Sequence, residues 1–364
     1  MRRAKQIRAH SFIIVFVSLA YGSPLLADLI DKGSVSFVNR NSDANCESRE
    51  INTGCIRAAK DLSAIGRVGP YLVIGGDEAV GPDQNLNIIQ VLSKHEDGQY
   101  LAGEDILLPD VGNDGGELDI EGIAVDGNFI YVVGSHSFRR NKVRSQKSVK
   151  RNRKTFNQGK IKDERSHDWL HRIEVNQQVQ PLAKKSISLR DVISDHPALK
   201  AFSEIPSKEN GVDIEGIAVA DGWVYVGFRG PVFRDNYVPV LKFKFDQHEK
   251  SASLLLVKLE GGGIRDMAKV QDGFLLVSGP VGEAPGPYQV YHWNGLDMVP
   301  GKDRDDTEGY IKKLGDIDVS KGKAEGILVL EPERGADDDC QYKFMIIFDG
   351  IINGNPKIFC SPKD

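Results

Sequence analysis

One phrase, Asp-Ile-Glu-Gly-Ile-Ala-Val, occurs twice in the chain, at residues 119–125 and 213–219. Each copy is followed by a short turn and a hydrophobic segment, a pattern typical of an antiparallel β-hairpin. Three weaker copies of this pattern begin at Asp61, Gly262 and Ala324. A chain with five such copies is expected to fold as a repeat structure with one supersecondary unit per copy.

Further strand-like segments follow the better copies, so four strands per unit fit the sequence. Four-stranded units at a period somewhat above about 40 to 45 residues are typical of a β-propeller with loop insertions. We therefore predict an all-β fold, a β-propeller of five four-stranded antiparallel blades. A degenerate sixth blade is an open alternative, with residues 35–56 or 309–319 as its source.

Small residues recur in the first strand of the two best copies. Such strands line the central channel of a propeller, where neighbouring blades crowd one another. Gly122, Ala124, Gly216 and Ala218 are therefore predicted to be positions of close approach between blades.

The amino-terminal residues 1–27 resemble a secretory signal peptide, with four basic residues, a short apolar stretch and small residues before Ala27. The apolar stretch is shorter than the roughly 20 residues of a spanning helix, and no later window is a transmembrane candidate. We predict an exported protein, periplasmic or secreted, with residues 28–364 as one propeller domain that carries a basic loop insertion at 139–165.

The chain has four cysteines: Cys46, Cys55, Cys340 and Cys360. Export favours disulfides over metal binding, because no pair has Cys-x-x-Cys spacing. Three pairings are open. Since both pairs lie near the ends of the mature chain, we expect the amino-terminal strand to complete the last blade, with a disulfide near this seam.

Charge is distributed very unevenly along the chain. Residues 139–162 contain eleven basic residues and no acid. Removing these charges and the four basic charges of residues 1–27 from the formal net charge of −5 leaves −20 for the rest. The segment is either a solvated loop or a lid that attracts anions. Nucleic acid is not an expected partner, because the run has no aromatic stacking platform.

Loops that enter the first strand and leave the second strand of each blade open on one face of a propeller. The acids Glu121, Glu215 and Glu325 converge there and suit a hard cation such as Ca²⁺, which prefers oxygen ligands. An alternative is that Glu121 and Glu215 bond to backbone amides or pair with Arg265. Ser63 and Arg265 stand where the other two blades would have the glutamate.

Other polar residues on this face are candidates for catalysis or ligand binding. His136 is a candidate general base, while its neighbours Ser135 and Ser137 point to the other side of the strand and are candidate ligand contacts. The remaining candidates are Arg229, Arg265 and Asp266 for catalysis and Asp77 and Asp349 for ligand binding.

Four phrases in the same order resemble a bacterial β-propeller family known as a domain of unknown function. They are Asp-Ile-Glu-Gly-Ile-Ala, Gly-Ser-His-Ser at 134–137, Phe-Arg-Gly-Pro-Val at 228–232 and Gly-Ile-Arg-Asp at 263–266. The Asp-x-Glu-Gly-Ile element is also similar to that of phytase-like esterase propellers and, more loosely, calcium-bound lactonases. That resemblance implies hydrolysis of an ester or phosphoester.

Three functions are compatible with the sequence. The first is an exported hydrolase in which a cation polarises an ester or phosphoester. The second is a non-catalytic propeller that binds a small anionic ligand or a protein partner at the same mouth. The third is a structural platform in the cell envelope. A calcium dependence would distinguish the first from the other two.

Overall fold

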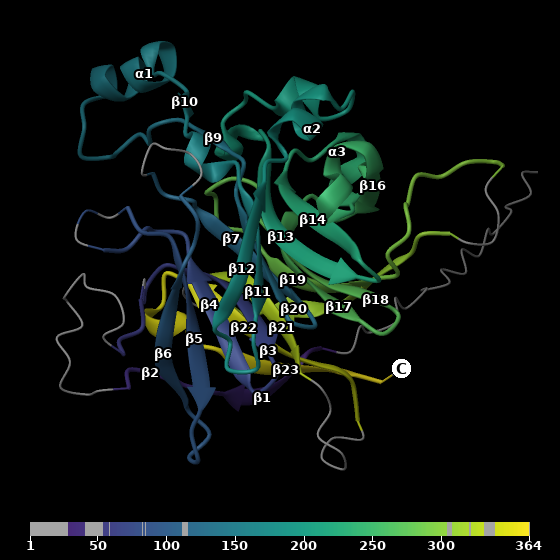
Figure 1. Ribbon diagram of the computed structural model, residues 1–364. Helices are drawn as coiled ribbons and strands as arrows, with labels where there is room; N and C mark the ends of the chain where they lie inside the picture. The colour runs from purple at the N-terminus through teal and green to yellow at the C-terminus, as the bar shows by residue number, and fades with distance from the viewer. Residues whose placement is uncertain are drawn as a thin grey trace, which may run out of the picture.

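The computed structural model describes residues 28–40, 54–57, 59–81, 83, 85–110, 116–303, 308–319, 322–330 and 339–363. Five antiparallel sheets surround a central axis, and the first strand of each contacts the first strands of both neighbouring sheets (Figure 1). The fold is a five-bladed β-propeller. The expected signal peptide, residues 1–27, lies outside the described residues.

Each blade has four consecutive antiparallel strands, from the channel outward. Blade 1 consists of β3 (Leu62–Val68), β4 (Tyr71–Gly76), β5 (Ile88–Lys94) and β6 (Tyr100–Leu107). Blade 2 consists of β7 (Ile120–Asp126), β8 (Phe129–Gly134), β11 (Leu170–Val175) and β12 (Pro181–Ile187). Blade 3 consists of β13 (Asp213–Ala220), β14 (Trp223–Gly230), β15 (Tyr237–Phe243) and β16 (Ser253–Lys258).

Blade 4 consists of β17 (Gly263–Val270), β18 (Gly273–Gly279), β19 (Tyr288–Trp293) and β20 (Ile311–Ile317). Blade 5 consists of β21 (Lys323–Leu330), β22 (Cys340–Asp349), β23 (Lys357–Pro362) and β1 (Ile30–Ser34). The five repeat copies thus coincide with the inner hairpins of the five blades. The segment 309–319 supplies β20, so it forms no sixth blade.

The ring closes through the amino-terminal segment, as the sequence predicted. β1 pairs with β23 as the outer strand of blade 5, and β2 (Phe37–Val38) then pairs in parallel with β6 of blade 1. The closing strand is Ile30–Ser34, earlier than the expected 34–39, because the latter segment turns to the next blade. One short stretch of chain therefore bonds to both blades at the seam.

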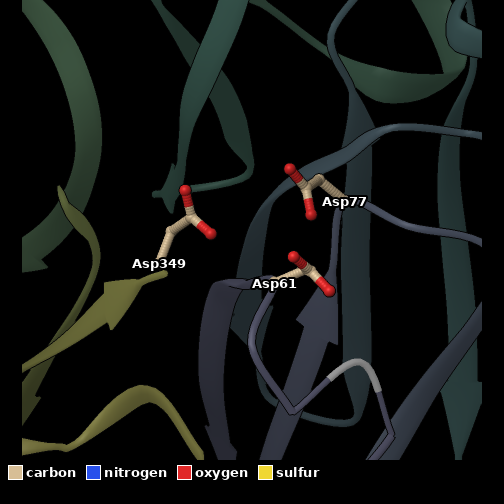
Figure 2. Close-up of side chains that lie close together, drawn as sticks. All are labelled: Asp61, Asp77 and Asp349. Carbon is tan, nitrogen blue, oxygen red and sulfur yellow. The ribbon is translucent and has the colours of Figure 1, made fainter. Parts of the chain in front are cut away.

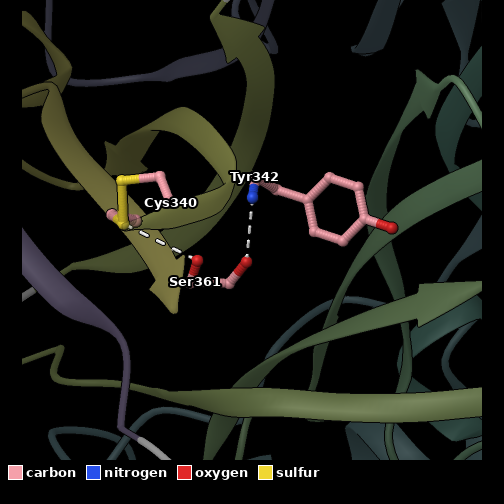
Figure 3. The surroundings of a disulfide bond; sticks show 4 residues. Cys340, Tyr342 and Ser361 are labelled. Carbon is pink, nitrogen blue, oxygen red and sulfur yellow. Dashed lines mark hydrogen bonds between the residues drawn. A yellow bond between two sulfur atoms is a disulfide. The ribbon is translucent and has the colours of Figure 1, made fainter. Parts of the chain in front are cut away.

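A disulfide joins Cys340 to Cys360 in blade 5 (Figure 3). It links β22 to β23, and Cys360 also lies opposite Ile30 of β1, so the bond lies in the blade that the amino-terminal strand completes. Next to it, the Tyr342 backbone N–H donates to Ser361 Oγ at 3.1 Å. Cys55 is disulfide-bonded as well, whereas Cys46 lies outside the described residues.

The hydrophobic core consists of layers between the faces of adjacent blades rather than one centre. Valine, isoleucine and leucine side chains of blades 2 and 3, for example, form one buried cluster. The predicted close approaches are present. A Cβ on Gly122 would lie 2.8 Å from Ile217 Cγ2, and one on Gly216 would lie 3.0 Å from Ile264 Cγ2. Glycine lets the inner strands approach because a side chain would overlap the neighbouring blade.

The basic insertion leaves blade 2 directly after β8. Its stem is the two-stranded ladder of β9 (Phe138–Arg139) and β10 (Lys162–Asp163), and its outer part carries α1 (Val149–Gln158). In Figure 1, α1 lies at the upper left, beyond this stem. Two more short α-helices, α2 (Arg190–Asp195) and α3 (His248–Ser251), lie elsewhere in the described chain.

Six 3-10 turns complete the described elements: η1 (Arg165–His167), η2 (Lys200–Phe202), η3 (Ser207–Glu209), η4 (Arg234–Asn236), η5 (Phe245–Gln247) and η6 (Ile352–Gly354). Within the described ranges, no helix combines the length and the apolar character that crossing a bilayer requires.

Candidate functional site

All five inner strands are irregular at the same position. The register of each inner hairpin shifts at one residue, which leaves that residue unpaired in a β-bulge. Side chains on a regular blade strand face the neighbouring blades, whereas a bulge can redirect a side chain. The five bulge residues are Ser63, Glu121, Glu215, Arg265 and Glu325. These are the positions that sequence comparison of the repeats had aligned.

Arg265 joins the bulge residues of blades 3 and 5. Its Nε lies 2.8 Å from Glu215 Oε2, and its Nη2 donates to Glu325 Oε1. All three side chains are at least 95% buried. Glu215 therefore pairs with Arg265, one of the alternatives that the sequence had left open. Two of the three glutamates expected to bind a metal already have a buried guanidinium as their counter-ion.

Arg229, at the end of β14, adds a second buried guanidinium to this network. It donates to Asp213 Oδ2 and forms an ion pair with Glu215 Oε1. Buried charges are tolerated when they are paired in this way. Neither Arg229 nor Arg265 has the exposure expected of a group that receives a ligand, since they are 3% and 2% exposed.

Glu121 has no ion pair with any residue in the described chain. One oxygen each of Glu121, Asp213 and Glu215 lies within 4.8 Å of the other two. Burial raises the pKa of Glu121 well above its usual range, and the nearby Glu215 charge raises it further. The structure thus brings Glu121 and Glu215 together, but Asp213 rather than Glu325 is the third carboxylate.

Asp266 lies one residue beyond the bulge of blade 4 and bonds to backbone. Its Oδ1 accepts from the Met267 N–H at 2.7 Å and its Oδ2 from the Ile327 N–H of blade 5 at 2.8 Å. The Ile217 N–H of blade 3 also bonds to this carboxyl group. Asp266 therefore ties three inner strands together. Burial nevertheless raises its pKa well above the usual range.

His136 is buried with both ring nitrogens engaged. Its Nδ1 lies 2.8 Å from the Gly134 carbonyl oxygen, and its Nε2 accepts from the Leu189 N–H at 3.2 Å. These partners require the neutral ring with the proton on Nδ1. Burial correspondingly lowers the pKa of His136. A proton shuttle needs a free nitrogen, and this ring has none.

Ser135 and Ser137 point to the other side, as expected, and their hydroxyl groups lie 2.9 Å apart. Ser135 Oγ is also 3.4 Å from Nδ1 of His167, a buried residue that sequence inspection did not single out. His167 Nδ1 lies 3.6 Å from Asp119 Oδ2, and its Nε2 lies 3.3 Å from Glu164 Oε2. His167 links the first strand of blade 2 to the return of the insertion.

A second group of carboxylates lies where blade 5 meets blade 1. Asp61 precedes β3, Asp77 follows β4, and Asp349 ends β22, and one oxygen of each lies within 4.8 Å of the other two. Figure 2 shows the three carboxyl groups turned toward one another. Lys323 Nζ lies 2.5 Å from Asp349 Oδ2, and among the described residues it is the one cation that pairs with this trio.

The trio has more negative charge than its surroundings balance. Burial raises the pKa of Asp77 to about 9, and the charges of Asp119 and Asp349 add to the shift. Burial and the Asp349 charge also raise the pKa of Asp61. Nearby, burial and the charges of Asp119 and Glu78 raise the pKa of Glu117 to about 7. The mouth of the channel is therefore short of positive charge.

A family model described as "Protein of unknown function (DUF3616)" matches residues 61–353. The chain belongs to the DUF3616 family. Its matched range begins with the first inner strand and includes all five bulge residues. No curated protein matches the chain.

Solved structures similar to this DUF3616 protein include an exo-beta-1,3-galactanase from Phanerochaete chrysosporium at 9% identity and TM-score 0.44, covering 91% of this chain and 64% of that one. A Trypanosoma rangeli sialidase is 11% identical with TM-score 0.38, covering 91% and 58%. The Dos1 propeller is 9% identical with TM-score 0.36, covering 85% and 94%. These values carry no argument about activity.

The channel of this DUF3616 protein has a second, less polar part. A hollow of about 410 Å³ lies beyond the bulge residues, toward the hairpin ends of the inner strands. Its wall is mostly apolar, with Ile123, Ile217 and Ile327 among its residues, and Arg67 and Lys269 lie on its border. It contains no carboxylate, so the acidic chemistry is confined to the mouth.

Proposed function

We propose that the channel mouth binds a hard divalent cation, with Ca²⁺ the best candidate, between Asp61, Asp77 and Asp349. The carrying observation is the mutual approach of three carboxylate oxygens to within 4.8 Å. Two oxygens that each lie about 2.4 Å from a shared Ca²⁺ are at most about 4.8 Å apart. The all-oxygen donor set, drawn from two blades, also suits this ion.

This trio is a better candidate than Glu121, Glu215 and Glu325, the set expected from the sequence. Arg229 and Arg265 already compensate Glu215 from two sides, and Arg265 also compensates Glu325. A further cation at these glutamates would lie close to two guanidinium groups. Repulsion between like charges is strong in a buried site, so the less compensated trio is favoured.

A cation in this position would act as a Lewis acid toward an ester or phosphoester oxygen. Glu121 could accept a proton, because its carboxylate has no cationic partner among the described residues. Asp119 and His167 form a second proton-accepting pair beside the mouth. We therefore propose hydrolysis of a small anionic ester or phosphoester, in line with the resemblance to phytase-like esterase propellers. Cation-dependent binding of an anionic ligand without hydrolysis is the alternative.

We also propose that the protein acts outside the cytoplasm. The Cys340–Cys360 disulfide supports this, because disulfides persist in oxidising compartments. The signal-like residues 1–27 support it from the sequence. Extracellular and periplasmic Ca²⁺ would then be available to the mouth.

Calorimetric titration of the mature protein with Ca²⁺ tests the proposal. We expect one binding site, and we expect the double variant Asp61→Asn, Asp77→Asn to weaken binding at least tenfold, because it removes two charged ligands. The matched control is Asp126→Asn, an exposed aspartate at the hairpin end of blade 2. Binding in the control should equal that of the unmodified protein. No heat of binding in the unmodified protein would refute the cation site.

Hydrolysis is tested separately with chromogenic carboxylic esters and phosphoesters, with Ca²⁺ present and after addition of a chelator. We expect turnover that stops with the chelator and in the Asp61, Asp77 double variant. Glu121→Gln should reduce turnover while leaving Ca²⁺ affinity within about threefold. Calcium binding without turnover of any ester would support the ligand-binding alternative.

A further inference from the structure

The helix α1 of the basic insertion has no evident source of stability within the described chain. None of its ten residues is buried, so it packs against nothing. An isolated helix of this length is marginal in water. Its first turn contains no acid but does contain Lys150 and Arg151, which face the positive end of the helix dipole. A partner that supplies negative charge would remove this repulsion.

Most cations of the insertion are uncompensated. Arg139 pairs with Glu164, Arg140 with Glu209 and Lys142 with Glu283, and these contacts hold the base of the insertion to the propeller. Beyond them, eight basic residues form no ion pair with any described residue: Arg144, Lys147, Lys150, Arg151, Arg153, Lys154, Lys160 and Lys162. The propeller body, in contrast, is strongly acidic, so an electrostatic partner for this end of the insertion is expected outside it.

The insertion also exposes apolar side chains, which a purely solvated basic loop would not need. Val149 and Phe156 of α1 are 72% and 59% exposed, and Val143 and Ile161 on its flanks are 45% and 36% exposed. Val149 and Phe156 are seven residues apart and therefore share one face of the helix, with Arg153 between them. Cations thus surround an apolar stripe.

We propose that α1 and its flanks dock on the surface of a lipid bilayer that contains anionic headgroups. Such a surface supplies phosphate charge to the lysines and arginines and an apolar layer to Val149 and Phe156, which is how basic amphipathic helices bind membranes. A soluble polyanion would satisfy the charges but would leave the apolar stripe in water. In Figure 1, α1 projects past the blades, so a flat surface can approach it.

Flotation of the mature full-length protein with lipid vesicles tests this docking. We expect binding to vesicles of equal parts phosphatidylglycerol and phosphatidylcholine, and none to phosphatidylcholine alone. Changing Lys150, Arg151, Arg153 and Lys154 to Gln should weaken binding on the order of 10²- to 10³-fold, given the typical contribution of each basic residue near an anionic surface. The matched control changes Lys94, Lys200, Lys250 and Lys302, four exposed lysines of the body, to Gln and should bind normally.

A second variant separates a bilayer from a soluble polyanion. Phe156→Ser should weaken vesicle binding roughly tenfold, because an aromatic side chain then no longer enters the apolar layer, while leaving binding to inorganic polyphosphate unchanged. Hydrogen exchange at residues 149–158 should slow on anionic vesicles and not on neutral ones. Undiminished vesicle binding by either the quadruple variant or Phe156→Ser, or equal binding to neutral vesicles, would overturn the proposal. Calcium affinity should be the same in all variants.

Discussion

At the scale of single residues, the bulge position decides what the channel contains. The same backbone irregularity carries serine in blade 1, glutamate in blades 2, 3 and 5, and arginine in blade 4. Arginine at this position in one blade pairs with glutamates of both adjacent blades. The charge that remains is concentrated at Glu121 and at the Asp61, Asp77, Asp349 trio. We therefore interpret the channel as a compensated ring next to an uncompensated cation site.

Asp77 makes this interpretation testable by pH. Its pKa rises from the usual range to about 9 on folding, mainly through burial, so the folded state holds this proton more tightly than the unfolded state. The resulting stability is fully present below about pH 4 and is lost as the pH rises through about 9. Asp77→Asn should remove this loss, so that the variant becomes more stable than the unmodified protein at pH 8.

Denaturant unfolding at pH 5 and pH 8, without divalent cations, measures this effect. Addition of Ca²⁺ at pH 8 should stabilise the unmodified protein and not Asp77→Asn, because the ion replaces the proton. An unmodified protein and a variant whose stabilities change in parallel with pH would show that Asp77 does not carry the excess charge.

At the scale of elements, the inner strands pack through residues without side chains. Gly122 faces Ile217 of the next blade, and Gly216 faces Ile264 in the same way. These contacts let five strands surround a channel narrow enough for Arg265 to reach both Glu215 and Glu325. The geometry of the site thus depends on small residues that have no chemical function.

Gly122→Ala tests the packing of the inner strands. The new Cβ would lie 2.8 Å from Ile217 Cγ2 and 3.3 Å from the Glu215 carbonyl oxygen, so either β7 or β13 must shift. We expect a loss of about 1–3 kcal/mol in the free energy of unfolding, typical of overpacking. Gly282→Ala is the control, since its Cβ would meet Lys208 O at an ordinary 3.7 Å. Equal stabilities of the two variants in denaturant unfolding would contradict the close approach.

At the scale of the whole molecule, the repeats predicted the blades and their order because each hairpin has its own local pattern. Closure by the amino-terminal strand was also predictable, since a ring needs its ends joined. The pairing of Arg229 and Arg265 was not, because it depends on which blades become neighbours. Asp61 was missed although it aligns with Asp119 and Asp213 in the repeats. His167 has no repeat counterpart, and only the fold places it beside Asp119.

The most direct measurement of the central claim is anomalous diffraction from crystals of the mature protein grown with Ca²⁺. The account predicts one strong anomalous peak at the mouth, at about 2.3–2.6 Å from an oxygen of each of Asp61, Asp77 and Asp349, with Lys323 displaced from Asp349. A map without a peak there, or with its peak between Glu121, Asp213 and Glu215, would contradict it.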